Sequence, residues 1–213
     1  MSSSRRRRTP NGHRPRTGQD AESAHRLTRP STSHRGFWAP LALTLSLVLL
    51  TFTSRVQDNQ ILTWSFWGAT ILLLVWQITL FLQVKRSSTG VSLRTELRPQ
   101  HYVQALAQVA VLSYWGWHWP PVYDHAWLLV AQLLFAYAFD MLLAWSRRNS
   151  YTLGFGPFPI IFSTNLFLWF RDDWFALQFL MVAVGFLGKE LVTWTRDGRR
   201  THIFNPSSFP LAV

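Results

Sequence analysis

Six apolar runs follow one another along the chain after residue 36, and no other feature limits its possible folds as strongly. They are Phe37–Thr53, Ile61–Val84, Tyr102–Trp119, Ala126–Trp145, Gly156–Phe170 and Trp174–Trp194. A helix needs about 20 residues to cross the hydrocarbon core of a bilayer. The second, fourth and sixth runs reach that length, the first and third are slightly short, and the fifth is distinctly short. We therefore predict an all-α fold, a polytopic membrane helix bundle with six transmembrane helices.

The distribution of basic residues is an independent check on this segmentation and gives it an orientation. With a cytoplasmic N-terminus, 18 of the 21 Lys and Arg residues fall in the N-terminal tail and the inner loops. The outer loops then hold only Arg55 and Arg171, and Lys189 lies within a predicted span. Membrane proteins carry an excess of Lys and Arg on the cytoplasmic side. The pattern therefore predicts six spans with both ends inside, in a multi-pass protein of the inner (plasma) membrane.

The first 35 residues have a different composition from the rest of the chain. They hold nine Arg against Asp20 and Glu22, which accounts for +7 of the net charge of +11, and they contain no aromatic residue. Such a segment cannot bury enough apolar surface to offset the entropy of ordering it. We predict that residues 1–35 are a disordered, basic cytoplasmic tail attracted to anionic lipid headgroups. Nucleic-acid binding is not expected, because no aromatic platform or folded motif accompanies the charge.

The chain after the sixth run predicts the start of a seventh helix. A basic turn follows Trp194, and a new apolar run starts at Asn205-Pro206 and continues to Val213. Asn is a favoured helix N-cap and Pro is favoured at the next position. We therefore assign residues 36–213 to one transmembrane helical domain and expect this domain to be truncated at its C-terminal end. As an isolated chain, we expect it to be inactive.

The fifth run begins and continues unlike the others. Its start, Gly154-Phe-Gly-Pro-Phe-Pro159, predicts an unwound or kinked helix beginning, and Ser163, Thr164 and Asn165 follow near mid-membrane. Irregular backbone at that depth is tolerated where it is buried in protein or lines a cavity. Two interpretations remain open. Either the run is a discontinuous helix that contributes to a binding site, or it is a bundle-facing helix whose polar residues bond to neighbouring helices.

Two charged residues lie inside predicted spans at similar depth. Asp140 precedes Arg147 by seven residues and Lys189 precedes Arg196 by seven, so each lies about 10 Å along its helix from the cytoplasmic boundary. Intramembrane charges usually pair or face water, so we predict an intramembrane charge pair between Asp140 and Lys189. The alternative is that Lys189 extends to the cytoplasmic surface. Glu190 is rotated by about 100° from Lys189 and is expected to meet Arg147 or Arg148 instead.

Metal and catalytic motifs are not evident in the sequence. The chain has no cysteine, which excludes disulfides and thiolate metal sites on it. His118 and His125 could share a metal at the outer face, but both belong to an aromatic, Pro-rich loop, and we interpret them as interfacial residues. No metal site is predicted. Because no catalytic motif is present, we assign no enzyme class from the residues themselves.

One stretch resembles a known family. Lys189-Glu190-Leu191 at a helix end, a basic turn and Ile203-Phe204-Asn205-Pro206 at the start of a new helix resemble the NqrB/RnfD family. These are membrane subunits of sodium-pumping NADH:quinone reductase and of Rnf-type electron-transport complexes. The similarity covers about residues 155–213, the N-terminal part of the family pattern, and no comparable match covers the first 100 residues.

The resemblance implies a flavin-carrying subunit that couples electron transfer to ion movement beside other membrane subunits. FMN or riboflavin would be the cofactor, with Asn205, Lys189 and Asn165 as candidate cofactor-binding residues. An N-capped helix at Asn205 would offer free amides to a phosphate. In the family, FMN is esterified to a Thr in a Ser-Gly-Ala-Thr-like motif downstream of Asn-Pro, and no attachment motif is present in this segment. Gly68-Ala69-Thr70 lies in the wrong place and lacks the preceding Ser, so the attachment is not transferred to Thr70.

Three functional hypotheses follow. The first is a redox membrane subunit in which the cofactor supplies the chemistry and the protein supplies placement and electrostatics. The second is a non-redox channel or transporter for a small solute on the same fold. The third is a structural membrane scaffold, which the dense aromatic content and the few intramembrane charges favour. Neither the electron donor and acceptor nor a coupling ion is encoded in a motif of this sequence.

Overall fold

The structure is a computed structural model that describes residues 35–87, 92–95, 99–148, 150–168, 172–196 and 199–202. The chain divides into two units, residues 1–31 and 32–213, and every described element belongs to the second. The predicted tail, residues 1–35, lies outside the described residues apart from Arg35, as does the predicted helix start at Asn205-Pro206.

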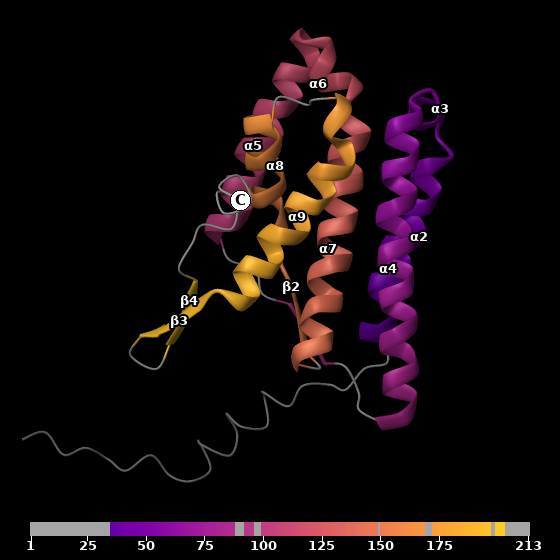
Figure 1. Ribbon diagram of the computed structural model, residues 1–213. Coiled ribbons are helices and arrows are strands. Elements are labelled where there is room, and N and C mark those ends of the chain that lie inside the picture. The colour runs from indigo at the N-terminus through magenta and orange to yellow at the C-terminus, as the bar shows by residue number, and fades with distance from the viewer. Residues whose placement is uncertain are drawn as a thin grey trace, which may run out of the picture. The chain divides into compact units, whose positions relative to one another are not determined.

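The described residues are mostly helical (Figure 1). The elements in chain order are α2 (Arg35–Thr51), α3 (Ser54–Gln57), α4 (Gln60–Ser87), β1 (Ser92–Thr95), α5 (Pro99–His118), α6 (Pro120–Asp124), α7 (Ala126–Arg148), β2 (Ser150–Leu153), α8 (Pro157–Leu168), the 3₁₀ helix η1 (Asp172–Trp174), α9 (Phe175–Leu191), β3 (Thr193–Arg196) and β4 (Arg199–His202). The all-α prediction agrees with this architecture, to which four strands of four residues each are added.

Each of the six apolar runs overlaps one of the longer helices: α2, α4, α5, α7, α8 and α9. Two of these helices are long and apolar enough to cross a membrane, over Gln60–Gln83 in α4 and Ala126–Arg147 in α7, each with a mean hydropathy of 1.8. By length and composition, these two helices suggest a membrane protein. Helix α8, with 12 residues, is the shortest of the six, and it begins at Pro157 after a bend and turn at residues 154–156.

Helix α7 is the helix around which the others pack. It contacts α2, α4, α8 and α9, and 61% of its apolar window is buried, against 39% for the window in α4. At its middle, Phe135 is fully buried, and its ring lies 5.3 Å from that of Phe179 on α9. Phe179 in turn meets Phe66 of α4 edge-on at 5.7 Å. These aromatic contacts join α4, α7 and α9 into one apolar core.

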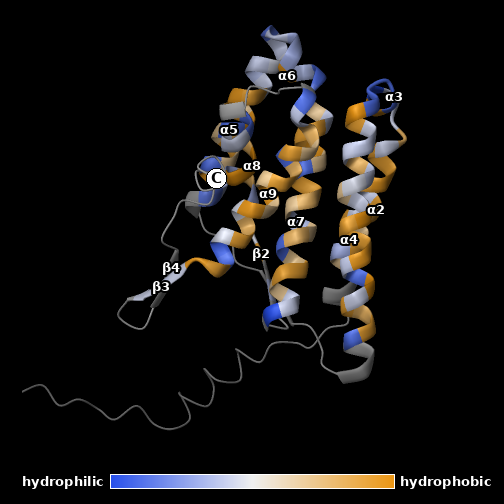
Figure 2. Cartoon of the chain, viewed as in Figure 1, coloured by the Kyte–Doolittle hydropathy of each residue, from blue (hydrophilic) through white to orange (hydrophobic). Residues whose placement is uncertain are grey.

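Figure 2 shows how hydrophobic and polar residues are distributed along the helices. The longer helices are predominantly hydrophobic, and the polar colours concentrate at helix ends and in the connecting segments. The exposed side chains of α4 nevertheless include many large hydrophobic ones: Ile61, Trp64, Ile71, Leu72, Val75, Ile78, Phe81 and Leu82. Helix α4 is thus apolar on its exposed side as well as on its buried side.

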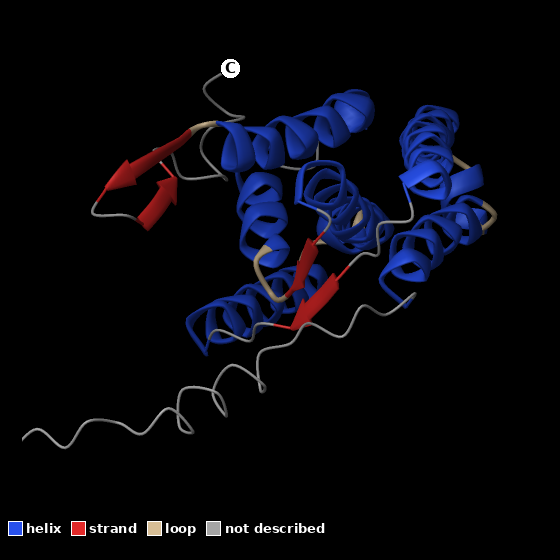
Figure 3. Ribbon diagram, turned by 90° about the horizontal axis from the view of Figure 1, so that it is seen from below, coloured by secondary structure: helices blue, strands red, loops and turns tan. Residues whose placement is uncertain are grey.

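The four strands form two small pairs (Figure 3). Strands β1 and β2 pair in parallel, with Ser92 opposite Ser150 and Thr95 opposite Leu153. Strands β3 and β4 form an antiparallel pair directly after α9, with Thr193 opposite His202 and Arg196 opposite Arg199. The basic turn expected after the sixth run is therefore a β-hairpin in this structure.

We predict that Phe135→Ala lowers the free energy of unfolding by about 3–5 kcal/mol, because it removes the ring that α4 and α9 pack around. Val130→Ala on the same helix is the control, since Val130 is 41% exposed and its loss leaves no internal cavity. The measurement is denaturant- or SDS-induced unfolding of the detergent-solubilised protein. Equal losses for the two variants would contradict the central position of Phe135.

Candidate functional site

The two charged residues that the sequence places at similar depth in predicted spans lie together in the structure. Lys189 Nζ on α9 is 3.8 Å from Asp140 Oδ2 on α7. Both side chains are mostly buried, with exposed fractions of 28% and 25%. Lys189 Nζ also lies over the ring of Phe186, 5.3 Å from its centroid, where the face of the ring attracts a cation. Lys189 is thus held between a carboxylate and an aromatic face.

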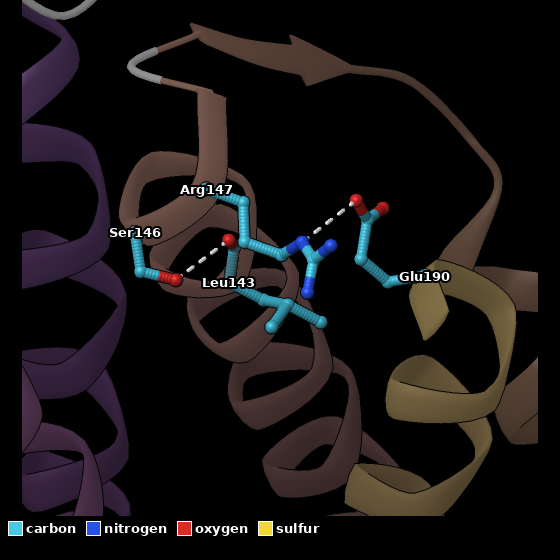
Figure 4. Close-up of polar contacts among 4 residues, drawn as sticks. All are labelled: Leu143, Ser146, Arg147 and Glu190. Carbon is cyan, nitrogen blue, oxygen red and sulfur yellow. Dashed lines mark hydrogen bonds and ion pairs between the residues drawn. The ribbon is translucent and has the colours of Figure 1, made fainter. Parts of the chain in front are cut away.

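A second ion pair joins the same two helices next to the first. Arg147 Nε on α7 lies 3.5 Å from Glu190 Oε1 on α9 (Figure 4). The Ser146 hydroxyl, one residue away, donates to the Leu143 carbonyl and so bonds to its own helix instead of competing for Glu190. Of the two partners that the sequence allows for Glu190, Arg147 makes the contact, and the side chain of Arg148 lies outside the described residues.

A third polar contact between α7 and α9 lies further along the helices. Gln132 Nε2 donates to Gln178 Oε1 at 2.8 Å, and both side chains are buried. Gln178 precedes Lys189 by 11 residues, so this contact lies about 16 Å along α9 from the charge pair. The partners advance together along both helices, which shows that α7 and α9 run in the same direction.

Asn165 of α8 extends this contact into a chain of three amides, which we call the amide relay (Asn165, Gln132 and Gln178). Asn165 Nδ2 donates to Gln132 Oε1 and also to the Ile161 carbonyl, the latter at 2.9 Å. Because a carbonyl accepts only, the bond to Ile161 identifies the Asn165 nitrogen and fixes the direction of the whole relay. Its two ends, Asn165 Oδ1 and Gln178 Nε2, are buried and have no hydrogen-bond partner among the described residues.

The other polar residues of α8 also face its neighbours. Gln108 Nε2 of α5 donates to Ser163 Oγ at 3.2 Å, and the Thr164 hydroxyl bonds to the Ile160 carbonyl of its own helix. The polar triplet Ser163-Thr164-Asn165 therefore connects α8 to α5 on one side and to the amide relay on the other. These contacts show α8 as a bundle-facing helix, one of the two interpretations that the sequence leaves open.

A hydrogen bond from α7 stabilises the bend that precedes α8. The Tyr137 hydroxyl donates to the Gly154 carbonyl at 2.7 Å, in the bend before Pro157. Nearby on β2, burial raises the pKa of the Tyr151 phenol, and the negative charge of Asp140 and the Tyr137 phenol raise it further. Tyr151 is therefore a neutral phenol at physiological pH, close enough to Asp140 to feel its charge.

The residues suggested for a flavin do not converge on one site in the described part of the chain. Asn165 belongs to the amide relay. Lys189 pairs with Asp140, and it lies about 16 Å along α9 from Gln178, the relay residue on that helix. Asn205 lies outside the described residues. Thr70 is fully buried in α4, which leaves no space for a phosphoester at its hydroxyl. Because Asn205 is not among the described residues, the FMN site stays a prediction.

Metal-ligand clusters give no further candidate. Within the residues that the structure describes, no three His, Cys, Asp or Glu side chains lie close enough to hold a metal ion. His125 Nδ1 lies 2.6 Å from the Pro121 carbonyl, and its ring contacts Phe175 at 5.7 Å. His125 thus contacts α6 and the start of α9, and its interfacial location stays a prediction.

Sequence reasoning missed Gln132 and Gln178. Each is the lone amide in an otherwise apolar stretch, and a neutral polar residue in such a helix tends to face the bundle. That signal could have identified both residues as buried. Their partners depend on which helices become neighbours, which the sequence alone does not show.

We predict that Asp140→Asn costs about 1–3 kcal/mol of unfolding free energy, because it leaves Lys189 largely buried without its counter-charge. The double variant Asp140→Asn, Lys189→Met should recover much of the loss, since no unpaired charge remains. Thermal unfolding in detergent measures the unsubstituted protein, the single variants Asp140→Asn and Lys189→Met, and the double variant, with Asp58→Asn, an exposed carboxylate, as the control. A double variant as unstable as the sum of its single variants would show that the pair does not interact.

For the amide relay, Gln132→Leu should destabilise the protein more than Gln178→Leu. Gln132 bonds at both ends, so its loss leaves two amide partners unpaired, and each buried unpaired group costs about 1–3 kcal/mol. Gln178→Leu leaves one partner unpaired, and Gln104→Leu on the exposed face of α5 is the control. The same unfolding assay would contradict the relay if all three variants behaved alike.

Comparison of the chain with models of protein families, with curated proteins and with solved structures finds no match.

Proposed function

We propose that this chain is a multi-pass integral membrane protein whose six longer helices form the six predicted spans, with a cytoplasmic N-terminus. The observation that supports the proposal is the apolar exposed surface of the helices that surround α7. On α5, as on α4, the exposed residues are largely hydrophobic: Tyr102, Val103, Leu106, Val109, Val111, Tyr114 and Trp117. Exposed apolar surface of this extent matches a lipid environment.

The aromatic residues at one end of the helices support the same orientation. Trp117 is 86% exposed at the end of α5, and Trp64 is 68% exposed in the first turns of α4. Arg55 of α3 lies 4.4 Å from the ring centroid of Tyr123 on α6, at this same end of the chain's helices. Exposed Trp and Tyr beside an Arg are typical of a membrane–water interface, and we assign this end to the outer face.

Within this membrane protein, we propose the role of a subunit in an ion-translocating electron-transport complex of the NqrB/RnfD type. The resemblance near Lys189 and Asn205 supports this role, and the Asp140–Lys189 pair adds a physical reason. A carboxylate inside the membrane attracts cations. Lys189 neutralises the Asp140 carboxylate until a mobile cation displaces the Lys189 ammonium from it. For this role, Asn205, Lys189 and Asn165 are the candidate flavin-binding residues that the resemblance implies.

A non-redox channel or transporter for a small polar solute is the second candidate, and the amide relay is the observation that favours it. The relay presents one buried acceptor, Asn165 Oδ1, and one buried donor, Gln178 Nε2, between apolar helices. Groups of both kinds could exchange hydrogen bonds with a neutral solute. A structural scaffold is the third candidate and requires neither property.

The test uses the protein expressed from its full gene. We expect it to stay in the membrane fraction after an alkaline carbonate wash and, after purification in detergent and denaturation, to keep yellow flavin fluorescence on the protein band. The wash tests membrane integration and the fluorescence tests the redox role, because a covalently held flavin survives denaturation.

The outcomes separate the candidates. Release by the carbonate wash would refute the membrane proposal itself. Integration with neither covalent nor acid-extractable flavin would refute the redox role and favour the channel or the scaffold. Gln178→Leu, which removes the buried donor of the amide relay, can then separate those two in a solute-flux assay of reconstituted vesicles, since only a channel would lose or change its flux.

A further inference from the structure

The β3–β4 hairpin follows α9 directly and combines a Trp with three Arg in eight described residues. Its strands read Thr-Trp-Thr-Arg at Thr193–Arg196 and Arg-Arg-Thr-His at Arg199–His202, and Figure 3 shows it extending from the end of α9. With Asp197 in the connecting turn of the sequence, residues 193–202 carry a net charge of +2, counting His as neutral. The hairpin plays no part in either ion pair described above.

The strand register brings like charges together. Arg196 lies directly opposite Arg199, and the next pair is Thr195 with Arg200. Like charges directly opposite one another destabilise a two-stranded ladder. An anion shared by the two guanidinium groups removes that repulsion, and phosphate is the anion that guanidinium binds in a bidentate manner.

An exposed Trp shares a face of the ladder with this pair. In an antiparallel pair, alternate residues lie on the same face, so Trp194, Arg196, Arg199 and Thr201 lie on one face. Trp194 is 62% exposed, and Leu191 at the end of α9 is 53% exposed. Charged residues alone would be enough to protect the edge of a small sheet, but an exposed Trp adds nothing to that protection. Trp beside Arg is the combination found at the headgroup level of a membrane.

We propose that the β3–β4 hairpin binds anionic phospholipid headgroups on the cytoplasmic surface. Its arginines contact the lipid phosphates, and Trp194 lies among the headgroups. This inference rests on the membrane integration proposed above, and it differs from the attraction of the N-terminal tail because a folded ladder, with two arginines held opposite each other, forms the site. The two arginines are expected to prefer anionic over zwitterionic phospholipids. Both kinds of lipid carry a phosphate, but only the anionic lipid has a net negative charge.

The experiment measures lipid binding to the full chain in detergent by native mass spectrometry, with phosphatidylglycerol and phosphatidylcholine as the probes. Near an anionic surface each Arg contributes about a fivefold increase in affinity, so Arg196→Gln with Arg199→Gln should weaken phosphatidylglycerol binding roughly 10- to 25-fold. Binding of phosphatidylcholine should stay the same. The variant Arg196→Lys, Arg199→Lys keeps the charge and should retain most of the preference.

Two controls separate the hairpin from other basic residues. Arg55→Gln removes one charge at the opposite end of the helices and should leave the preference unchanged. Replacing Arg5, Arg6, Arg7 and Arg8 by Gln removes part of the tail charge, and the effect of the hairpin substitutions should persist in that background. A preference that disappears with the tail substitutions alone and ignores the hairpin substitutions would overturn the proposal.

The outcomes also separate this inference from the membrane proposal. Reconstitution of each variant into phosphatidylcholine nanodiscs reports membrane integration without an anionic lipid. Failure of the unsubstituted protein to enter them would refute the membrane proposal and the hairpin proposal together. Successful reconstitution, with equal phosphatidylglycerol binding by the unsubstituted protein and the Gln variant, would refute the hairpin proposal alone.

Discussion

The parallel packing of α7 against α9 is the interaction on which the rest of the structure depends. Three polar contacts join the two helices at successive levels, through Gln132 and Gln178, Asp140 and Lys189, and Arg147 and Glu190. A polar group in apolar surroundings is costly unless it is paired. Sliding one helix past the other by a turn would separate all three pairs at once, so these contacts fix the register that apolar packing alone would leave loose.

The neighbours of α7 are attached through polar contacts of the same kind. Helix α8 is joined at one end by the Tyr137 hydroxyl on the Gly154 carbonyl and at the other by Asn165 in the amide relay. Helices α2 and α4 are joined by Gln77, whose side-chain amide donates to the Pro40 carbonyl at 3.3 Å and also contacts Thr44. Apolar side chains supply the contact area, and a small number of amides and charges decide which helix faces which.

The sequence allowed the helices to be predicted better than their contacts. Apolar runs bounded by charges located all six longer helices, and α7 begins at the predicted residue, Ala126. The pair of Asp140 with Lys189 was predictable because both residues lie at similar depth in their predicted spans, and a charge inside an apolar helix needs a partner. The amide relay could not be predicted, since amides pair by proximity in space and carry no charge that demands a partner. The four-residue strands were missed because segments so short show no clear alternation of apolar and polar residues.

In the described helices, apolar side chains cover much of the exposed surface, and several polar groups are buried. This distribution limits what the protein can do. The exposed sides of α4 and α5 are apolar, whereas buried polar groups lie between packed helices: the amide relay between α7, α8 and α9, and Gln77 with Thr44 between α4 and α2. In water, the exposed apolar side chains of α4 and α5 would be unfavourable, and the buried polar groups would be removed from a solvent that could hydrogen-bond to them. The proposal of a lipid environment accounts for both features. Under that proposal, the α7–α9 side is the path we expect for ions or polar solutes, because it combines the Asp140 carboxylate with the amide relay, about 12 Å apart along α7.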